Sequence, residues 1–398
     1  MHCPVASLAA ALLAGWFALP APAQVITGID VLAANGCAQL RGRKVGLITN
    51  HTGLTRDGRR TVDVLHDCKD VALVSLFSPE HGWLGVVDEK VSDTVDKATG
   101  LKVFSLYGKT RKPTDEMLQG IDTLVFDIQD IGCRFYTYIA TMRAALEAAA
   151  EHDLRFVVLD RPNPIGGLVM AGPVLTEARR DFVGAHTIPL QHGMTTGELA
   201  RMMVGENGLQ VQLDTVTCTG WQRADLWHHT GLTWTNPSPN MRRLTQALTY
   251  PGVGLVEGTN VSVGRGTDTP FEILGAPWCD GDALAAHLNA AKLPGVAFVP
   301  VRFTPTSSKH KNTLCGGVHI LVTNWRNFEA VRTGVHIACA LHKLFAKDWD
   351  TKRLDWLLKD RATYDAILAD TPAEDIISKW RRPLELFRLR RQPFLLYE

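Results

Sequence analysis

Residues 71–83 read VALVSLFSPEHGW, and this stretch predicts a buried strand that runs directly into a polar loop. A short apolar run of this kind is typical of a strand that is covered on both faces. Pro79 cannot donate a hydrogen bond to a sheet and Gly82 permits a sharp turn, so we expect the strand to end here. The chain then presents the carboxyl group of Glu80 and the imidazole of His81 on a short loop.

Glu80 is our candidate for a general acid. The same loop carries Trp83, and a carboxylic acid beside an aromatic ring can have its pKa raised by desolvation, as a general acid requires. In the alternative interpretation, the loop is a solvated turn whose Glu80 and His81 side chains point to water, as most exposed loop acids do. The other strands of the chain decide between the two, because several of them end in the same way.

The strand-and-loop pattern recurs throughout the first half of the chain, with helical patterns between the strands. Such alternation is typical of a parallel sheet with helices on both faces. We therefore predict an α/β fold with a Rossmann-like N-terminal domain over residues 24–185. The further predicted strands cover residues 45–48, 102–106, 123–126 and 156–159, and the predicted helices cover residues 61–67, 113–118 and 138–152.

Polar side chains cluster directly after four of these strands. In sheets of this kind, ligands bind beyond the carboxyl ends of the strands. Four clusters of polar side chains at this edge of the sheet therefore indicate a binding site. No GxGxxG motif follows the first strand and no P-loop motif is present, so we expect no nucleotide cofactor. The residues are Asn50 and His51, Glu80 and His81, Asp127, Gln129, Asp130, Arg134 and Tyr136, and finally Asp160, Arg161 and Asn163.

Two polar segments open the second half of the chain. Residues 191–199 predict a loop that enters a helix, with Thr195 and Glu198 spaced as in a capping box. His192 precedes this cap and is a candidate to face a cleft, with a purely structural position as the alternative. Residues 234–241 predict a rigid loop with two prolines, in which Asn240 is a candidate hydrogen-bond donor to a polar ligand.

Residues 250–267 are rich in glycine and surround Glu257 and Arg265. Two glycines flank the arginine and would let the backbone approach a ligand closely. The planar fork of a guanidinium group suits a carboxylate. The alternative is a glycine-rich hairpin in which Arg265 pairs with a local acid, Asp268 or Glu257.

The length of the chain suggests two domains, and we assign residues 186–398 to a second, α+β domain. Helical patterns alternate there with strand-like runs, and we find no internal repeat and no low-complexity segment. The predicted helices cover residues 280–291 and 328–345, and the predicted strands cover residues 296–303 and 317–322.

The first 23 residues contain no Lys, Arg, Asp or Glu, and residues 5–19 are apolar. Ala21 and Ala23 match the small-residue rule for cleavage, so we predict a signal peptide over residues 1–23 and a periplasmic or secreted protein. The apolar run is short for a membrane span, and no later stretch is suited to one. The remaining cysteines are scattered without metal spacing; one or two disulfides are compatible with export, and buried free thiols are the simpler alternative.

The net charge of +1 gives no reason to expect a nucleic-acid partner. No pattern in the sequence specifies an oligomeric state.

Several long motifs in register resemble those of one enzyme family. The motifs are residues 77–82 (FSPEHG), 126–138 (FDIQDIGCRFYTY), 160–164 (DRPNP), 257–267 (EGTNVSVGRGT), 270–271 (PF) and 275–278 (GAPW). Together they resemble the exo-β-N-acetylmuramidases of glycoside hydrolase family 171, long called a domain of unknown function. The resemblance covers residues 28–398 and implies a Rossmann-like domain, an auxiliary domain and a cleft between them. It also implies removal of terminal β-1,4-linked N-acetylmuramic acid from the non-reducing end of peptidoglycan fragments.

Cleavage of a glycosidic bond usually takes two carboxyl groups. We assign Glu80 as the general acid and Asp127 as its partner, with Asp130 and Glu257 as alternatives. The acetamide of the substrate could instead act as an internal nucleophile. We expect Asp160 to hold Arg161 or its loop rather than to react.

The substrate carries a lactyl carboxylate, which needs a cation, and hydroxyl and acetamide groups, which need polar partners. Arg265 and Arg134 are our candidates for the carboxylate. The predicted substrate-binding residues are Asn50, His51, His81, Asp130, Arg134, Tyr136, Asn163, His192, Asn240, Glu257 and Arg265.

Two rival functions remain. One is a metal-dependent hydrolase that uses His51, His81, His192 and Asp127, but no HxxxH or HxH spacing supports a metal site. The other is a non-catalytic binder of wall fragments, since a fold can keep its cleft and lose its chemistry.

Overall fold

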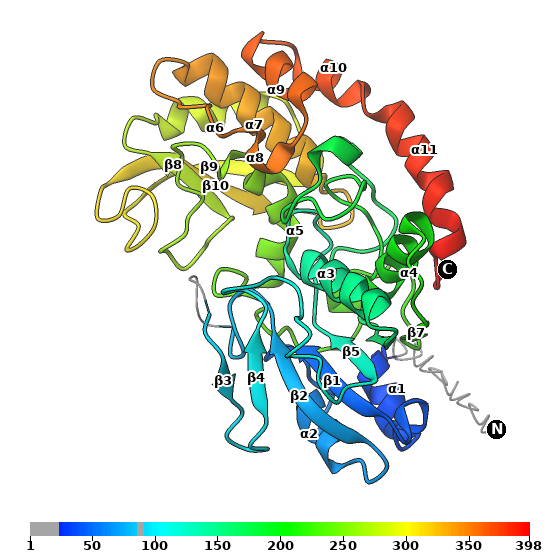
Figure 1. The fold of residues 1–398 in the computed structure, drawn as a ribbon. Helices are drawn as coiled ribbons and strands as arrows, with labels where there is room; N and C mark the ends of the chain where they lie inside the picture. The colour runs from blue at the N-terminus through cyan, green and yellow to red at the C-terminus, as the bar shows by residue number, and fades with distance from the viewer. Residues whose placement is uncertain (1–23, 86–90) are drawn as a thin grey trace, which may run out of the picture.

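The computed structural model describes residues 24–85 and 91–398, so the predicted signal peptide over residues 1–23 lies outside the described residues. Two lobes lie one above the other (Figure 1). In the described part of the chain, the N-terminal lobe is built on a seven-stranded sheet of order β3-β4-β2-β1-β5-β6-β7. Its neighbouring strands are parallel, except that β3 pairs antiparallel with β4. The strands are β1 (Lys44–Thr49), β2 (Ala72–Ser78), β3 (Thr94–Val95), β4 (Lys102–Ser105), β5 (Thr123–Asp127), β6 (Arg155–Leu159) and β7 (Leu213–Val216).

Both faces of this sheet are apolar, which is why helices cover both. Val125 packs with α1 (Gly28–Ala34) and α2 (Thr61–Asp67) on one face. Its neighbours Leu124 and Phe126 point the other way, because successive side chains of a strand alternate. They pack with α3 (Tyr138–Glu151) and α4 (Thr196–Asn207) on the opposite face. The predicted α/β fold with helices on both faces is confirmed.

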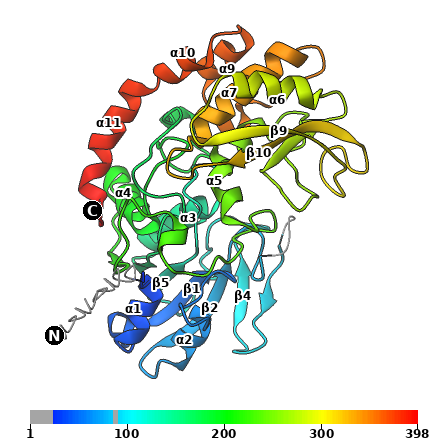
Figure 2. The same ribbon diagram turned by 180° about the vertical axis from the view of Figure 1, so that it is seen from behind.

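The C-terminal lobe contains, among the described residues, a three-stranded antiparallel sheet of order β8-β10-β9. Helices pack on this sheet, and α11 then runs back along the side of both lobes toward α4 (Figures 1 and 2). The strands are β8 (Ile273–Ala276), β9 (Val296–Phe303) and β10 (Cys315–Val322). The helices are α5 (Leu244–Val253), α6 (Gly281–Ala290), α7 (Ala330–Phe345), α8 (Asp355–Leu358), α9 (Arg361–Leu368), α10 (Ala373–Ser378) and α11 (Arg381–Arg391).

The boundary between the lobes lies further along the chain than residue 185. Both α4 and β7 belong to the N-terminal lobe, since β7 pairs with β6 and α4 packs on the same sheet. The boundary that we expected at residues 185 and 186 therefore falls inside this lobe.

One local prediction was wrong. Residues 113–118 form turns instead of a helix. A single helical hydrogen bond joins the N–H of Leu118 to the carbonyl of Thr114, and Gly120 follows in a left-handed conformation. The glycine-rich stretch, for which a hairpin was the alternative interpretation, begins with the end of α5 and a 3-10 turn over residues 250–256. Gly252 is needed there for helix packing, because a Cβ on it would lie 1.9 Å from the carbonyl oxygen of Ala330 in α7.

Cys37 and Cys68 form a disulfide that joins the segment after α1 to the end of α2. Five other described cysteines carry free thiols: Cys133, Cys218, Cys279, Cys315 and Cys339. No described helix is both long and apolar enough to span a membrane.

Candidate active site between the lobes

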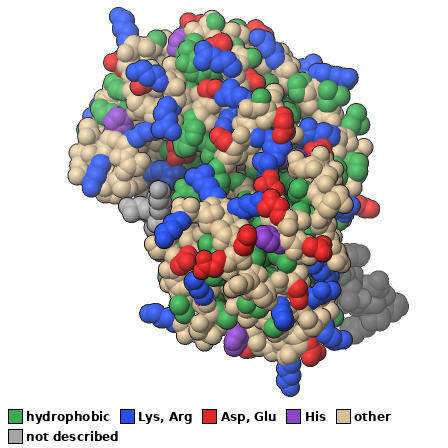
Figure 3. All heavy atoms as spheres, viewed as in Figure 1, with side chains coloured by type: hydrophobic (Ala, Val, Ile, Leu, Met, Phe, Trp, Pro, Cys, Tyr) green, Lys and Arg blue, Asp and Glu red, His purple; other side chains and the backbone are tan. Residues whose placement is uncertain are grey.

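A cavity of about 840 Å³ lies between the two lobes. One wall comes from loops that follow strands of the first sheet, and the other comes from α5, the residues after it and the loop between β9 and β10. The space-filling view shows acidic and basic side chains mixed over the visible face, without a broad area of one sign (Figure 3). Because the cavity is lined from both lobes, side chains that are far apart in the sequence can meet in it.

Six of the predicted site residues line this cavity and seven do not. Those that line it are Glu80, His81, Tyr136, Asn240, Glu257 and Arg265. Those outside its lining are Asn50, His51, Asp127, Asp130, Arg134, Asn163 and His192.

Glu80 reaches the cavity from the loop after β2. Its carboxylate accepts a short hydrogen bond from the hydroxyl of Thr137, which precedes α3. His81 has φ +69° and Gly82 has φ +74°, so the chain turns sharply directly after the acid. A non-glycine residue in this region is uncommon, and such strain gathers at functional loops. The loop therefore fixes the half-buried Glu80 carboxyl group at the cavity wall.

Glu257 and Arg265 face the cavity from the second lobe as an ion pair. The Arg265 Nε lies 2.6 Å from Oε1 of Glu257, and the guanidinium lies 5.3 Å from the centre of the Phe271 ring. Lys309 also donates a short hydrogen bond to the backbone carbonyl of Glu257. Burial lowers the pKa of Lys309, and the Glu257 charge opposes that shift. Arg265 thus does pair with a local acid, as the alternative interpretation held, yet both partners line the cavity.

An aromatic cluster closes the cavity where the lobes meet. The ring of Tyr250 lies edge-on to Phe135 at 5.0 Å, to Phe271 at 4.6 Å and to Tyr136 at 6.1 Å. Burial raises the pKa of both tyrosines well above its usual value, so their hydroxyl groups stay neutral. Such rings offer apolar faces with polar edges, which suits a sugar.

Sequence reasoning missed the charged and aromatic rim. Arg111 lies 3.7 Å from the Phe182 ring centre, and Phe182 stacks on Tyr107. On the other lobe, Arg353 lies 4.7 Å from the centre of the Trp356 ring. All five residues line the cavity. None sits in a polar cluster after a strand, so the signal that found Glu80 could not find them.

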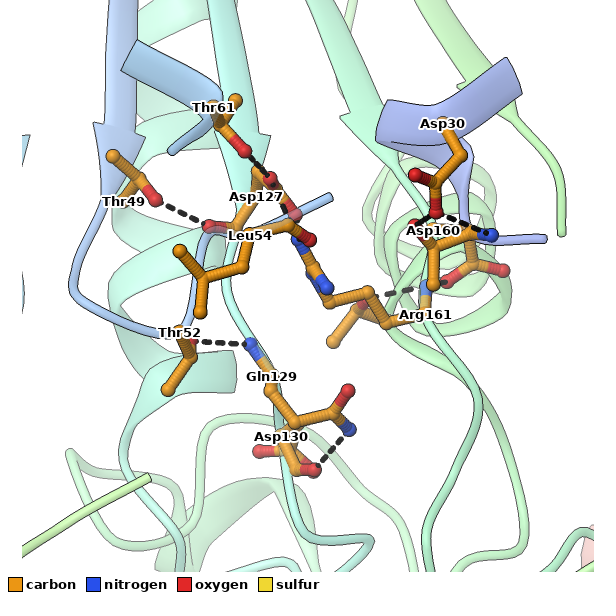
Figure 4. Close-up of polar contacts among 12 residues, drawn as sticks. Asp30, Thr49, Thr52, Leu54, Thr61, Asp127, Gln129, Asp130, Asp160 and Arg161 are labelled. Atoms are coloured by element: carbon orange, nitrogen blue, oxygen red, sulfur yellow. Dashed lines mark hydrogen bonds and ion pairs between the residues drawn. The ribbon is translucent and has the colours of Figure 1, made fainter. Parts of the chain in front are cut away.

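Asp127 is held in a buried ion pair instead of facing the cavity (Figure 4). Its two oxygens accept from Nε and Nη2 of Arg161 at 2.5 and 2.9 Å, and the hydroxyl of Thr61 donates a further short bond. The carboxyl group is 0% exposed. Our assignment of Asp127 as the second catalytic carboxyl group is therefore corrected: it holds Arg161. Asp160 accepts from the hydroxyl of Thr195 at 2.7 Å and from the N–H of Gly197 at 2.8 Å, so it joins the loop after β6 to the start of α4.

Arg134 is also a structural residue. Its guanidinium donates to the carbonyls of Pro173 at 2.9 Å, Leu357 at 3.0 Å and Leu358 at 2.8 Å, and the residue is 1% exposed. Burial lowers its pKa to about 10. It joins the loop before α3 to α8 of the other lobe, so it is not placed to meet a substrate carboxylate as we expected.

Asn50 and His51 do not line the cavity but contact residues next to it. The Nδ2 of Asn50 donates to the Tyr138 hydroxyl at 3.1 Å. The Nε2 of His51 lies 2.5 Å from the Asn236 carbonyl, and its ring packs on Gly85, where a Cβ would lie 1.8 Å from it. Burial lowers the pKa of His51. His51 therefore supports the loop that carries Glu80 and does not line the cavity.

The other three predicted binders are buried. Asp130 accepts from the N–H of Gly132 at 2.7 Å, and burial raises its pKa to about 7. Asn163 bridges its own turn to the carbonyl of Met194 at 3.0 Å. His192 is 0% exposed, and burial lowers its pKa to about 3. These three residues shape loops, which corrects our expectation that they bind the substrate.

The described residues contain no group of three or more His, Cys, Asp or Glu side chains placed to hold a metal ion. The fold and the cavity define a two-lobed α/β protein whose interlobe site carries acids, cations and aromatic rings. This combination suits a polar ligand of sugar size.

The family follows from comparison with known proteins. Residues 45–245 match the model of the N-terminal domain of the exo-β-N-acetylmuramidase NamZ, and residues 248–397 match that of its C-terminal domain. The chain belongs to this family of glycosidases. It is 44% identical over 379 residues to the peptidoglycan β-N-acetylmuramidase NamZ of Bacillus subtilis strain 168, covering 94% of this chain and 92% of that protein.

Two solved structures of DUF1343 family proteins from Bacteroides fragilis NCTC 9343 are similar over the whole fold. One is 38% identical with a TM-score of 0.88, and the other is 30% identical with a TM-score of 0.75. Each comparison covers 94% of this chain and 99% of the solved chain. The family models meet between residues 245 and 248, which agrees with a first lobe that extends past β7.

Proposed function

We propose that the protein is an exo-acting glycoside hydrolase that releases terminal β-1,4-linked N-acetylmuramic acid from the non-reducing end of peptidoglycan fragments. Membership of the exo-β-N-acetylmuramidase family supports the substrate and the reaction. The observation that carries the mechanism is the cavity between the lobes, which Glu80 lines from one side and Glu257 from the other.

Glu80 is the general acid of this proposal, and Glu257 is the second carboxyl group. Among Asp127, Asp130 and Glu257, our three candidates for that partner, only Glu257 lines the cavity. Glu80 would protonate the oxygen of the leaving sugar. Glu257, oriented by Arg265, would act at the opposite side of the bond, either directly or through water.

In this proposal, the cationic side chains of the cavity bind the lactyl carboxylate of N-acetylmuramic acid. Arg265 stays our candidate for it, and the structure adds Arg111, Lys309 and Arg353 to the same lining. An arginine fork can bind a carboxylate through two parallel hydrogen bonds. The neutral faces of Tyr250 and Tyr136 suit the apolar side of the sugar ring.

The first test is Glu80→Gln, measured on a disaccharide with a sugar leaving group and on a nitrophenyl N-acetylmuramide. The amide keeps the shape and the hydrogen bond from Thr137 but has no proton to give. We expect the disaccharide rate to fall by roughly 10²- to 10⁴-fold, with a smaller loss on the nitrophenyl substrate, which needs little protonation. Glu151→Gln, at an exposed ion pair with Lys112, is the matched control. A near-normal disaccharide rate would remove Glu80 from the acid role.

Glu257→Gln separates the two choices for the second group. If Glu257 acts on the reacting centre, both substrates should lose rate alike, since the loss does not depend on the leaving group. A rate that stays near normal would favour the substrate acetamide as the nucleophile. Saturable binding without any turnover by the unaltered protein would favour the non-catalytic binder, and turnover abolished by chelator would favour the metal-dependent hydrolase.

Export is a further part of the proposal. The apolar first 23 residues, which end in a cleavage-like Ala21-x-Ala23, support a signal peptide. The Cys37–Cys68 disulfide supports an oxidising destination such as the periplasm or the exterior. N-terminal sequencing of the protein from fractionated cells should give Gln24 as the first residue of the mature chain.

A further inference from the structure

Thr137 and Glu80 line the cavity between the lobes together, although they are 57 positions apart in the sequence. Glu80 follows β2, and Thr137 directly precedes α3. The hydroxyl of Thr137 donates a short hydrogen bond to Oε2 of Glu80. This bond joins the loop after β2 to the start of α3 at the wall of the cavity.

The hydroxyl of Thr137 does not cap the helix that it precedes. Thr137 is the N-cap residue of α3, and a threonine at this position usually accepts a hydrogen bond from an N–H group of the first helical turn. The Thr137 side chain makes no such bond, and its backbone has helical dihedral angles, φ −79° and ψ −7°. By contrast, Thr195 does cap α4, accepting from the N–H of Glu198 at 3.3 Å. The Thr137 hydroxyl therefore serves Glu80 instead of the helix.

The neighbours of Thr137 set the position of its hydroxyl. Tyr136 and Tyr138 are buried on either side of it in the chain, and their rings lie edge-on at 4.9 Å. The Nδ2 of Asn50 donates to the Tyr138 hydroxyl at 3.1 Å, and this hydroxyl donates a short bond to the Pro237 carbonyl. A β-branched side chain between two anchored residues has few rotamers open to it. The Thr137 hydroxyl is therefore a fixed donor at the cavity wall.

The hydrogen bond distinguishes the two oxygens of the Glu80 carboxyl group. A hydroxyl that donates to Oε2 keeps this atom as an acceptor, so the proton of the neutral acid belongs on Oε1. A general acid must hold its proton within hydrogen-bond reach of the leaving oxygen, about 2.6–3.2 Å. A carboxyl group that rotates freely presents its proton in that direction for only part of the time. Holding Oε2 therefore directs the proton on Oε1.

We infer that Thr137 is a positioning residue for the general acid: its hydroxyl holds Oε2 of Glu80 so that Oε1 delivers the proton to the leaving sugar. The inference rests on the proposed function, because it takes Glu80 as the general acid. The proton passes from Oε1 to the glycosidic oxygen while the bond from that oxygen to the anomeric carbon breaks, and the electron pair of this bond stays on the oxygen. Glu80 becomes a carboxylate, and Thr137 keeps its own proton and its hydrogen bond to Oε2.

The test compares Thr137→Val with Thr137→Ser in the full mature chain, on the disaccharide and on the nitrophenyl N-acetylmuramide. Valine keeps the branched shape but has no hydroxyl, so kcat on the disaccharide should fall roughly 10- to 100-fold while KM stays unchanged. The loss on the nitrophenyl substrate should be smaller, because its leaving group needs little protonation. Serine keeps the hydroxyl and should retain most of the disaccharide rate.

Two controls separate positioning from a general effect on the fold. Thr99 donates a hydrogen bond of 2.7 Å to the carboxylate of Asp96, outside the lining of the cavity. Thr99→Val removes a bond of the same kind and should leave both rates unchanged. In the Glu80→Gln background there is no proton to direct, so adding Thr137→Val should cause no further loss of rate.

Equal losses on the two substrates, a raised KM, or a further loss in the Glu80→Gln background would overturn the inference, because Thr137 would then act on the substrate or on the fold. So would a serine variant as slow as the valine variant. A near-normal disaccharide rate for Glu80→Gln would instead remove the acid role on which the inference rests. If Glu80→Gln is slow and Thr137→Val is as fast as the unaltered protein, only the role of Thr137 is refuted.

Discussion

Replacement of Asp127 by Asn tests whether this residue is structural or catalytic. From the sequence we assigned it as the second catalytic carboxyl group, whereas the structure shows it in a buried ion pair with Arg161. The carboxylate is 0% exposed and Arg161 is 6% exposed, with nitrogen–oxygen distances of 2.5 and 2.9 Å. An asparagine would turn its amide hydrogens toward a guanidinium group that can only donate. The substitution therefore leaves a buried positive charge without its partner.

The expected cost is about 3–5 kcal/mol of unfolding free energy, the usual result of breaking a buried ion pair from one side. The surface pair of Arg41 and Asp70 provides the control, because its side chains are 67% and 68% exposed. Asp70→Asn should cost less than about 1 kcal/mol, since water and salt screen an exposed pair.

The assay combines urea unfolding, followed by circular dichroism, with hydrolysis normalised to the folded fraction. We expect Asp127→Asn to unfold at lower urea while each folded molecule keeps most of its activity. A variant as stable as the unaltered protein but inactive would refute the reasoning, because it would place Asp127 among the reacting groups.

Three further predictions follow from buried groups. Asp130, whose pKa burial raises from 3.8 to about 7, holds a proton in the folded protein that the unfolded chain releases, so its stabilising contribution is lost as pH rises from about 4 through 7. The free energy of unfolding should therefore fall less for Asp130→Asn than for the unaltered protein between pH 5 and 8. Parallel curves of unfolding free energy against pH for the two proteins would contradict this. Reduction of the Cys37–Cys68 disulfide, which closes a separation of 31 residues, should cost roughly 3–4 kcal/mol, seen as a lower urea midpoint that Cys37→Ser reproduces. Arg134→Met should cost about 2–4 kcal/mol by leaving backbone carbonyls unpaired, with KM unchanged; a raised KM at normal stability would return Arg134 to the substrate.

The fold was predictable because both faces of the first sheet are buried. Phe126 and Val125 face opposite sides, yet both are apolar, so the strand reads as one continuous run. The helix over residues 61–67 and the strand over residues 296–303 were found with their observed bounds. Where packing overrides local signals, prediction failed. The glycine-rich pattern of residues 250–267 did not show that Gly252 lies in α5 and allows this helix to contact α7.

The site was predictable only in part, because a polar residue after a strand can turn outward or inward. Glu80 and Asp127 both follow apolar runs and look alike in sequence. Glu80 lines the cavity, whereas Asp127 is the last residue of β5 and meets Arg161, which follows β6. Sequence spacing could not distinguish the two acids, because the difference depends on which strands are neighbours in the sheet. Only Asp127 lies next to a buried cation, Arg161, on the neighbouring strand end.

The aromatic cluster links catalysis to folding. Phe135, Tyr136, Tyr250 and Phe271 line the cavity and also belong to one hydrophobic core that continues from α3 into β8 and β10. Arg134 adds hydrogen bonds across the same junction. Groups on opposite walls, such as Glu80 and Glu257, are therefore held by a shared core and not by a flexible linker. Because catalytic groups contribute most when their geometry is set before the substrate arrives, this junction is where the fold supports the chemistry.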